Sequence, residues 1–99
     1  MKDAVVLIAK AVRFGSSFDE AAFFFLLKKI EGIIYKGVGD ELQIEVKADN
    51  FSEISLRELI AIFSRYDIDM GQLRALVDDS NKRWVINPHA YWYKSMFEE

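Results

Sequence analysis

Three stretches of the chain have apolar patterns that predict β-strands. Residues 4–13 contain a run of Val, Leu and Ile without alternation, as in a strand buried on both faces, although the frequent Ala leaves a helix as the alternative. Residues 33–36 form a second apolar stretch. In residues 41–47 apolar and polar positions alternate, which predicts one buried and one solvated face. The turn residues 37–40 join the last two stretches into a predicted hairpin.

Two longer segments show helical spacing of apolar residues. Ser17 and Glu20 have the spacing of a capping box, and Gly32 is expected to end this first helix. Ser55 and Glu58 have the same spacing at the start of the second helix. Each helix has one apolar stripe, formed by Ala22, Phe23, Leu26, Leu27 and Ile30 in the first and by Leu56, Leu59, Ile60, Phe63 and Tyr66 in the second.

The C-terminal third of the chain is less regular. Asp69 is expected to cap a short third helix with an apolar face. Residues 84–86 allow a short fourth strand, whereas residues 90–97 are aromatic at too many positions to fit either period. The predicted order is β-α-β-β-α-α-(β) in a single domain, residues 1–99. This is an α+β fold with a small antiparallel sheet of three or four strands, two main helices and a short third helix.

The first strand raises a question of coverage. Two amphipathic helices cover one face of a sheet, yet the strand in residues 4–13 is apolar on its other face as well. The aromatic tail, residues 90–97, is the nearest candidate to cover that second face. A partner molecule is the other candidate.

The charge distribution narrows the choice of partner. The net charge is −3, but residues 40–79 hold ten acidic and four basic side chains, which gives −6 for that segment. An acidic middle argues against nucleic acid, because phosphate binding needs clustered Lys and Arg. It is compatible with a basic protein as the partner.

The composition also indicates in which cellular compartment the protein is expected. The chain has no Cys, which excludes disulfides and thiolate chemistry and makes the cytoplasm the expected location. The apolar run of residues 4–9 is too short, and its surroundings too charged, for a signal peptide or a membrane span. We therefore expect no membrane association.

Motifs for catalysis and for cofactors are lacking. The single His89 is not part of an HExxH motif, no GxSxG surrounds the serines, and no glycine-rich phosphate motif occurs. The segment from Asp67 to Gly71 faintly resembles a calcium loop, but Gly71 stands where a ligand belongs. We expect no enzyme, no metal and no cofactor. A small enzyme using carboxylates or His89 remains the alternative in this class.

Aromatic residues exceed what the apolar stripes need. Phe24 and Phe25 fall on the polar side of the first helix, either as core wrapped on several sides or as an exposed patch. Tyr91, Trp92 and Tyr93 are of the types that dominate protein interfaces, although packing over the sheet would also explain them.

Three stretches, residues 18–30, 55–73 and 90–97, together resemble small immunity proteins of bacterial contact-dependent growth-inhibition and related polymorphic-toxin systems. The likeness spans about half of the chain and carries over no functional residue. It implies a cytoplasmic protein that binds one cognate toxin domain and neutralises it.

This resemblance sets the first functional hypothesis, an inhibitor that binds a basic toxin through an acidic surface. Many toxins of these systems are nucleases, so a nuclease is one candidate. The second is a homo-oligomerising structural or adaptor module that uses Phe24, Phe25 and the aromatic tail. Monomer and homodimer both stay open. The predicted acidic contacts, expected to lie side by side, are Asp40, Glu41, Glu45, Asp49 and Glu53. The predicted aromatic contacts are Phe24, Tyr91, Trp92 and Tyr93.

Overall fold

The computed structural model describes residues 5–47 and 49–98 and has an α+β fold, as predicted. Ala4, which the sequence places in the first strand, lies outside the described residues. Three strands form one antiparallel sheet, and the remaining elements are helical. The elements in chain order are β1 (Val5–Lys10), α1 (Ser17–Lys29), β2 (Ile33–Val38), β3 (Glu41–Val46), α2 (Glu53–Arg65), the 3₁₀ helix η1 (Gly71–Leu76), α3 (Lys82–Val85) and α4 (Tyr93–Phe97).

The hairpin partner β3 is the central strand of the sheet. The strand order is β1-β3-β2, with both neighbours antiparallel to β3. Leu7 of β1 and Tyr35 of β2 both lie opposite Ile44. Side chains alternate across a sheet, so this register places all three on one face, the inner face, which packs against the helices. The other inner-face residues are Val5, Ala9, Ile33, Gly37, Leu42 and Val46.

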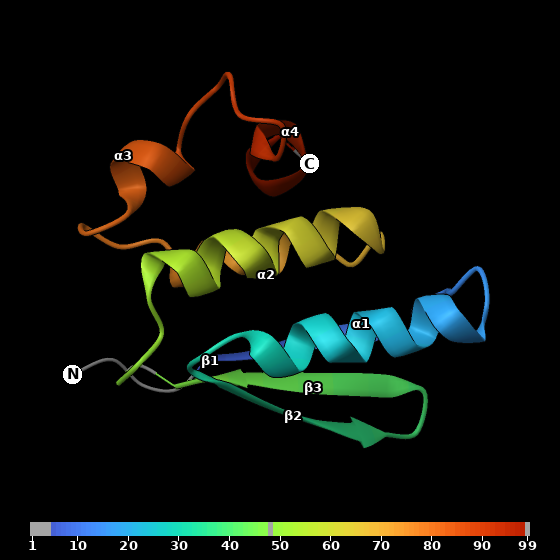
Figure 1. The fold of residues 1–99 in the computed structure, drawn as a ribbon. Coiled ribbons are helices and arrows are strands. Elements are labelled where there is room, and N and C mark those ends of the chain that lie inside the picture. The colour runs from blue at the N-terminus through green and yellow to red at the C-terminus, as the bar shows by residue number, and fades with distance from the viewer. Residues whose placement is uncertain (1–4, 48, 99) are drawn as a thin grey trace.

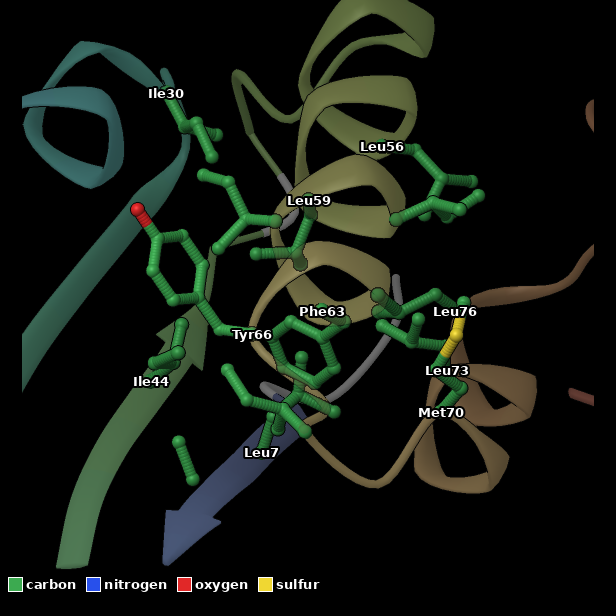
Figure 2. Packing of buried hydrophobic residues seen from close by; sticks show 14 of the residues in the cluster. Leu7, Ile30, Ile44, Leu56, Leu59, Phe63, Tyr66, Met70, Leu73 and Leu76 are labelled. Carbon is green, nitrogen blue, oxygen red and sulfur yellow. The ribbon is translucent and has the colours of Figure 1, made fainter. Parts of the chain in front are cut away.

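Helix α2 occupies the middle of the molecule. In Figure 1, α1 lies next to the sheet, α2 beside it, and the C-terminal helices α3 and α4 beyond α2. Figure 2 shows Leu7 and Ile44 from the sheet approaching Phe63 of α2, with Leu73 and Leu76 of η1 on another side. Because α2 has neighbours on several sides, even Ile62, outside its predicted apolar stripe, is buried.

Helix α1 is capped one residue earlier than predicted. The Ser16 hydroxyl accepts a hydrogen bond from the Asp19 N–H at 3.2 Å, so Ser16 and not Ser17 is the N-cap. The end of the helix agrees with the prediction. Gly32 follows it with a φ of +89°, and a Cβ there would lie 2.6 Å from the Phe51 Cα. Glycine is therefore required both by the backbone conformation and by the close approach of the next loop.

Helix α2 is capped three residues earlier than predicted, so that prediction is wrong. Ser52 caps the helix by accepting the N–H of Ser55 at 3.2 Å. Ser55 lies inside the helix and is buried, and its hydroxyl donates to the Glu31 carbonyl at 2.8 Å. This bond to the turn after α1 gives Ser55 a tertiary role that local spacing does not reveal.

The tail packs on the far side of α2 and not on the sheet. Residues 84–86 form no fourth strand in the described part of the chain, because 82–85 are the helical turn α3. Val85, Trp92 and Met96 are buried, and the Trp92 indole N–H donates to the Val85 carbonyl at 2.8 Å. The suggestion that the tail covers the second sheet face is therefore wrong.

One side chain closes the outer edge of β1. The Gln72 amide accepts the Ile8 N–H at 2.7 Å and donates to the Ile8 carbonyl at 2.7 Å. These two bonds imitate the pairing of another strand at a position where β1 has no neighbour. They also fix η1 against the sheet.

We expect Gln72→Ala to lower the free energy of unfolding by about 1–3 kcal/mol, because two backbone groups of Ile8 lose their partners. Urea denaturation followed by circular dichroism measures this change. Gln43→Ala is the matched control, since Gln43 projects from β3 on the opposite face to the core. Equal stability of the two variants would contradict the role assigned to Gln72.

Candidate functional site

The face of the sheet turned away from the helices is uncovered. Figure 1 shows no described element on that side of the three strands. The prediction that the first strand is buried on both faces is wrong, since the Val6 side chain is 55% exposed. Ile34 is 51% exposed on the same side. We call this surface the outer sheet face; it consists of Val6, Ile8, Lys10, Ile34, Lys36, Val38, Glu41, Gln43 and Glu45.

The strand register arranges the outer sheet face in rows across the sheet. Val6 and Ile34 flank Glu45 in one row. In the row at the other end of the strands, Lys10 and Val38 flank Glu41. Each carboxylate of β3 therefore has at least one exposed apolar neighbour. The middle row holds Ile8, Gln43 and Lys36.

A hollow lies on this face around Glu45. Its volume is about 340 Å³, and Glu45 shares its lining with apolar and basic side chains. The carboxylate is half-buried on the central strand, near one end of the sheet, where a contacting molecule would remove the remaining water. The other lining residues are Val6, Ile34, Tyr35, Lys36 and Gln43.

The five predicted acidic contacts do not form one patch. Glu41 and Glu45 lie on the outer sheet face together with Gln43, as the predicted alternation of residues 41–47 requires, whereas Lys47 follows the end of β3. Asp40 is in the turn before β3, whereas Asp49 follows its far end. Six strand residues at about 3.3 Å each keep these two carboxylates well apart.

Glu53 belongs to a different surface. It accepts a hydrogen bond from the Arg57 guanidinium at 2.9 Å, and that guanidinium lies 4.0 Å from the centre of the Trp84 ring. Glu53 also lines a second hollow of about 150 Å³ between the start of α2, the end of the sheet and the loop before α3. The charge of Glu53 is thus already matched within the chain.

The predicted aromatic contacts divide between core and surface. Phe24 is half-buried, with its ring centre 5.1 Å from Phe23 and 5.8 Å from Tyr35, so it extends the core. Trp92 is buried in the tail, and Tyr93 packs against Phe97 at 5.3 Å. Tyr91 alone of the predicted set is well exposed, at the edge of Trp92.

Two exposed aromatic residues lie on α1, apart from the outer sheet face. Phe25, which exceeds the apolar stripe in the sequence, points to solvent, and so does Phe18. Phe18 is not among the predicted contacts. Its spacing of seven residues from Phe25 places both on the same side of the helix, and this was the available signal.

The described titratable groups with shifted pKa values are few. Asp19 accepts the Gly15 N–H at 2.9 Å and the Tyr66 hydroxyl at 3.0 Å, which, with the nearby Arg65, lowers its pKa below the ordinary 3.8. Burial and the bond to Asp19 raise the pKa of Tyr66. Burial and the charge of Glu58 raise that of Tyr91. The Asp19–Tyr66 hydrogen bond joins the start of α1 to the end of α2 and contributes to the pKa shifts of these two residues.

The predicted alternatives for metal binding and catalysis involve His89 and the segment from Asp67 to Gly71. His89 is exposed in the turn before α4, where its N–H donates to the Asn87 side chain. Asp69 accepts the Gly71 N–H at 3.0 Å in the turn before η1, but Met70 is the N-cap of that helix, so the prediction of Asp69 as its cap is wrong. Among residues 5–47 and 49–98, no three His, Asp or Glu side chains gather as a metal site would need. None of the described helices is long and apolar enough to cross a membrane.

The lowered pKa of Asp19 predicts a stability contribution that is present above pH 3.8 and is lost as the pH falls through the lower folded-state value. We expect Asp19→Asn to unfold at a lower temperature than the wild type at about pH 7, with the gap closing towards about pH 3. Thermal melts across this range measure the gap. The control Asp79→Asn alters an exposed carboxylate paired with Lys82 and should show little change. A gap that stays constant with pH would contradict the assignment.

Comparisons with protein-family models, with curated proteins and with solved structures found no match to this chain. The assignment of a function therefore rests on the surfaces just described and on the resemblance of the sequence.

Proposed function

We propose that this chain is an immunity protein that binds and neutralises a cognate bacterial toxin domain, with the outer sheet face as its contact surface. The observation that carries the proposal is this uncovered face, on which exposed Val6 and Ile34 flank the half-buried Glu45. The resemblance of residues 18–30, 55–73 and 90–97 to immunity proteins supplies the class of partner.

The rigidity of the sheet supports this choice of surface. β3 is paired on both sides, and β1 is held at its outer edge by Gln72. Side chains on such a surface lose little further conformational freedom when a partner binds. The apolar residues Val6, Ile34 and Val38 then contribute area to the interface, while Glu45 and Glu41 contribute polar specificity.

The charges of the outer sheet face suit contacts with single basic side chains of a partner and not with a broad basic surface. Glu41 and Glu45 are balanced on the same face by Lys10 and Lys36, so this surface is not broadly acidic. A basic side chain of the toxin that enters the hollow would pair with the half-buried Glu45 between the apolar side chains of Val6 and Ile34. The net charge of −3 adds a general attraction to a basic toxin domain.

Identification of the partner is the first test. The tagged protein is captured from its native host, and the proteins that accompany it are identified by mass spectrometry. The proposal requires a toxin domain that binds the purified chain and loses its activity in the complex. Capture of a toxin that the purified chain neither binds nor inhibits would contradict the proposal.

We expect Glu45→Lys to lower the association rate constant with that toxin by roughly tenfold at low ionic strength, because a central attraction becomes a repulsion. Stopped-flow or surface-based kinetics measure the rate. Glu58→Lys, on α2, changes the net charge equally and is the matched control. Equal slowing by both variants would show that only overall charge matters and would contradict the assignment to the outer sheet face.

A further inference from the structure

Helix α1 is apolar on two opposite sides. Phe23 and Leu27 are fully buried on the side that faces the core. At about 100° per residue, Phe18, Ala21 and Phe25 lie on the opposite side of the helix. Phe18 is 87% exposed and Phe25 is 60% exposed. A surface helix normally has polar residues there, so within the described chain this stripe is exposed apolar surface of the kind that often marks an interaction site.

The charges at the two ends of α1 favour an antiparallel over a parallel second copy, with Glu20 as the exposed acid because Asp19 is already bound to Gly15 and Tyr66. The first turn contains Asp19 and Glu20, and the last turn contains Lys28 and Lys29. A second copy of α1 in antiparallel orientation would bring the basic end of each helix to the acidic end of the other. A parallel copy would bring like charges together. A two-fold axis perpendicular to the helices produces the favourable arrangement twice.

The spacing of the stripe also suits a two-fold pair. With the axis near Ala21, Phe18 of one copy lies beside Phe25 of the other, and the converse contact follows by symmetry. The small side chain of Ala21 at the crossing point permits close approach of the two helices. The Lys29 ammonium already lies 4.9 Å from the centre of the Phe25 ring. The basic end of α1 is therefore compatible with a contact between Phe25 and Phe18 of the second copy.

We propose that two copies of this chain associate through an antiparallel contact between their α1 helices, centred on Ala21. The helix has 13 residues and is about 20 Å long, so the contact is smaller than the roughly 1,200 Å² of a stable interface. The dimer is therefore reversible and depends on concentration. The stripe faces away from the sheet, so dimerisation is independent of the toxin contact proposed above.

Analytical ultracentrifugation of the full chain over a range of concentrations tests the association. The wild type should shift from monomer to dimer, and Phe25→Glu should raise the dissociation constant by at least roughly tenfold. Phe18→Glu provides a second variant at a more exposed position, should Phe25→Glu disturb folding. Ile54→Glu, at an exposed position of α2, is the matched control and should dimerise as the wild type does.

A wild-type chain that stays monomeric at every accessible concentration would overturn the proposal. Dimerisation that survives both Phe25→Glu and Phe18→Glu would overturn it equally, because the contact would then lie elsewhere. Since toxin binding is measured separately, either result leaves the proposed function to be judged on its own experiment.

Disulfide trapping tests the orientation, because the chain has no cysteine of its own. Ala21→Cys places one thiol per copy near the two-fold axis and should form a cross-linked dimer under mild oxidation. Lys29→Cys places the thiols at opposite ends of an antiparallel pair and should not cross-link. Efficient cross-linking of Lys29→Cys would indicate parallel helices and would overturn the antiparallel arrangement.

Discussion

Strand β3 is hydrogen-bonded to a neighbour on each side, and its register determines which side chains of the whole sheet are buried. Leu42, Ile44 and Val46 point to the helices, which places Leu7 and Tyr35 beside Ile44 in the core. The same alternation turns Glu41, Gln43 and Glu45 outward. A slip of one residue would bury these polar groups, and the core would lose its apolar contacts with α2.

The clearest sequence patterns predicted the elements closest to this constraint. The alternation of residues 41–47 and the stripe of α2 both correspond to the observed burial, because each element has one dominant inner side. The caps were harder to locate. Ser16 and Ser17 are adjacent, and Ser52 and Ser55 are three residues apart, so spacing alone permits more than one N-cap. At α2 the Ser55 hydroxyl donates to the Glu31 carbonyl outside the helix, so Ser55 serves a tertiary contact and Ser52 serves as the cap.

The predictions that are wrong concern segments whose burial depends on distant parts of the chain and not on the local sequence pattern. An unbroken apolar run, such as that of β1, ordinarily indicates burial on both faces, but Val6 is exposed because the tail packs elsewhere. Val85, Trp92 and Met96 are buried by the packing of the tail beside α2 and η1, and no periodicity reveals this destination. The acidic residues were grouped by sequence proximity, whereas β3 separates Asp40 from Asp49 by its length.

The two unusual surfaces have a common energetic meaning. Side chains such as Val6, Ile34, Phe18 and Phe25 remain largely exposed and so contribute little to the stability of the isolated fold. Burial of apolar area is worth about 25 cal/mol per Å², and at these positions that free energy is available for association. Helix α1 lies on the inner face of the sheet, opposite the outer sheet face. A dimer joined through α1 would therefore leave both outer sheet faces free, and one assembly could hold two toxin domains without competition between the two contacts.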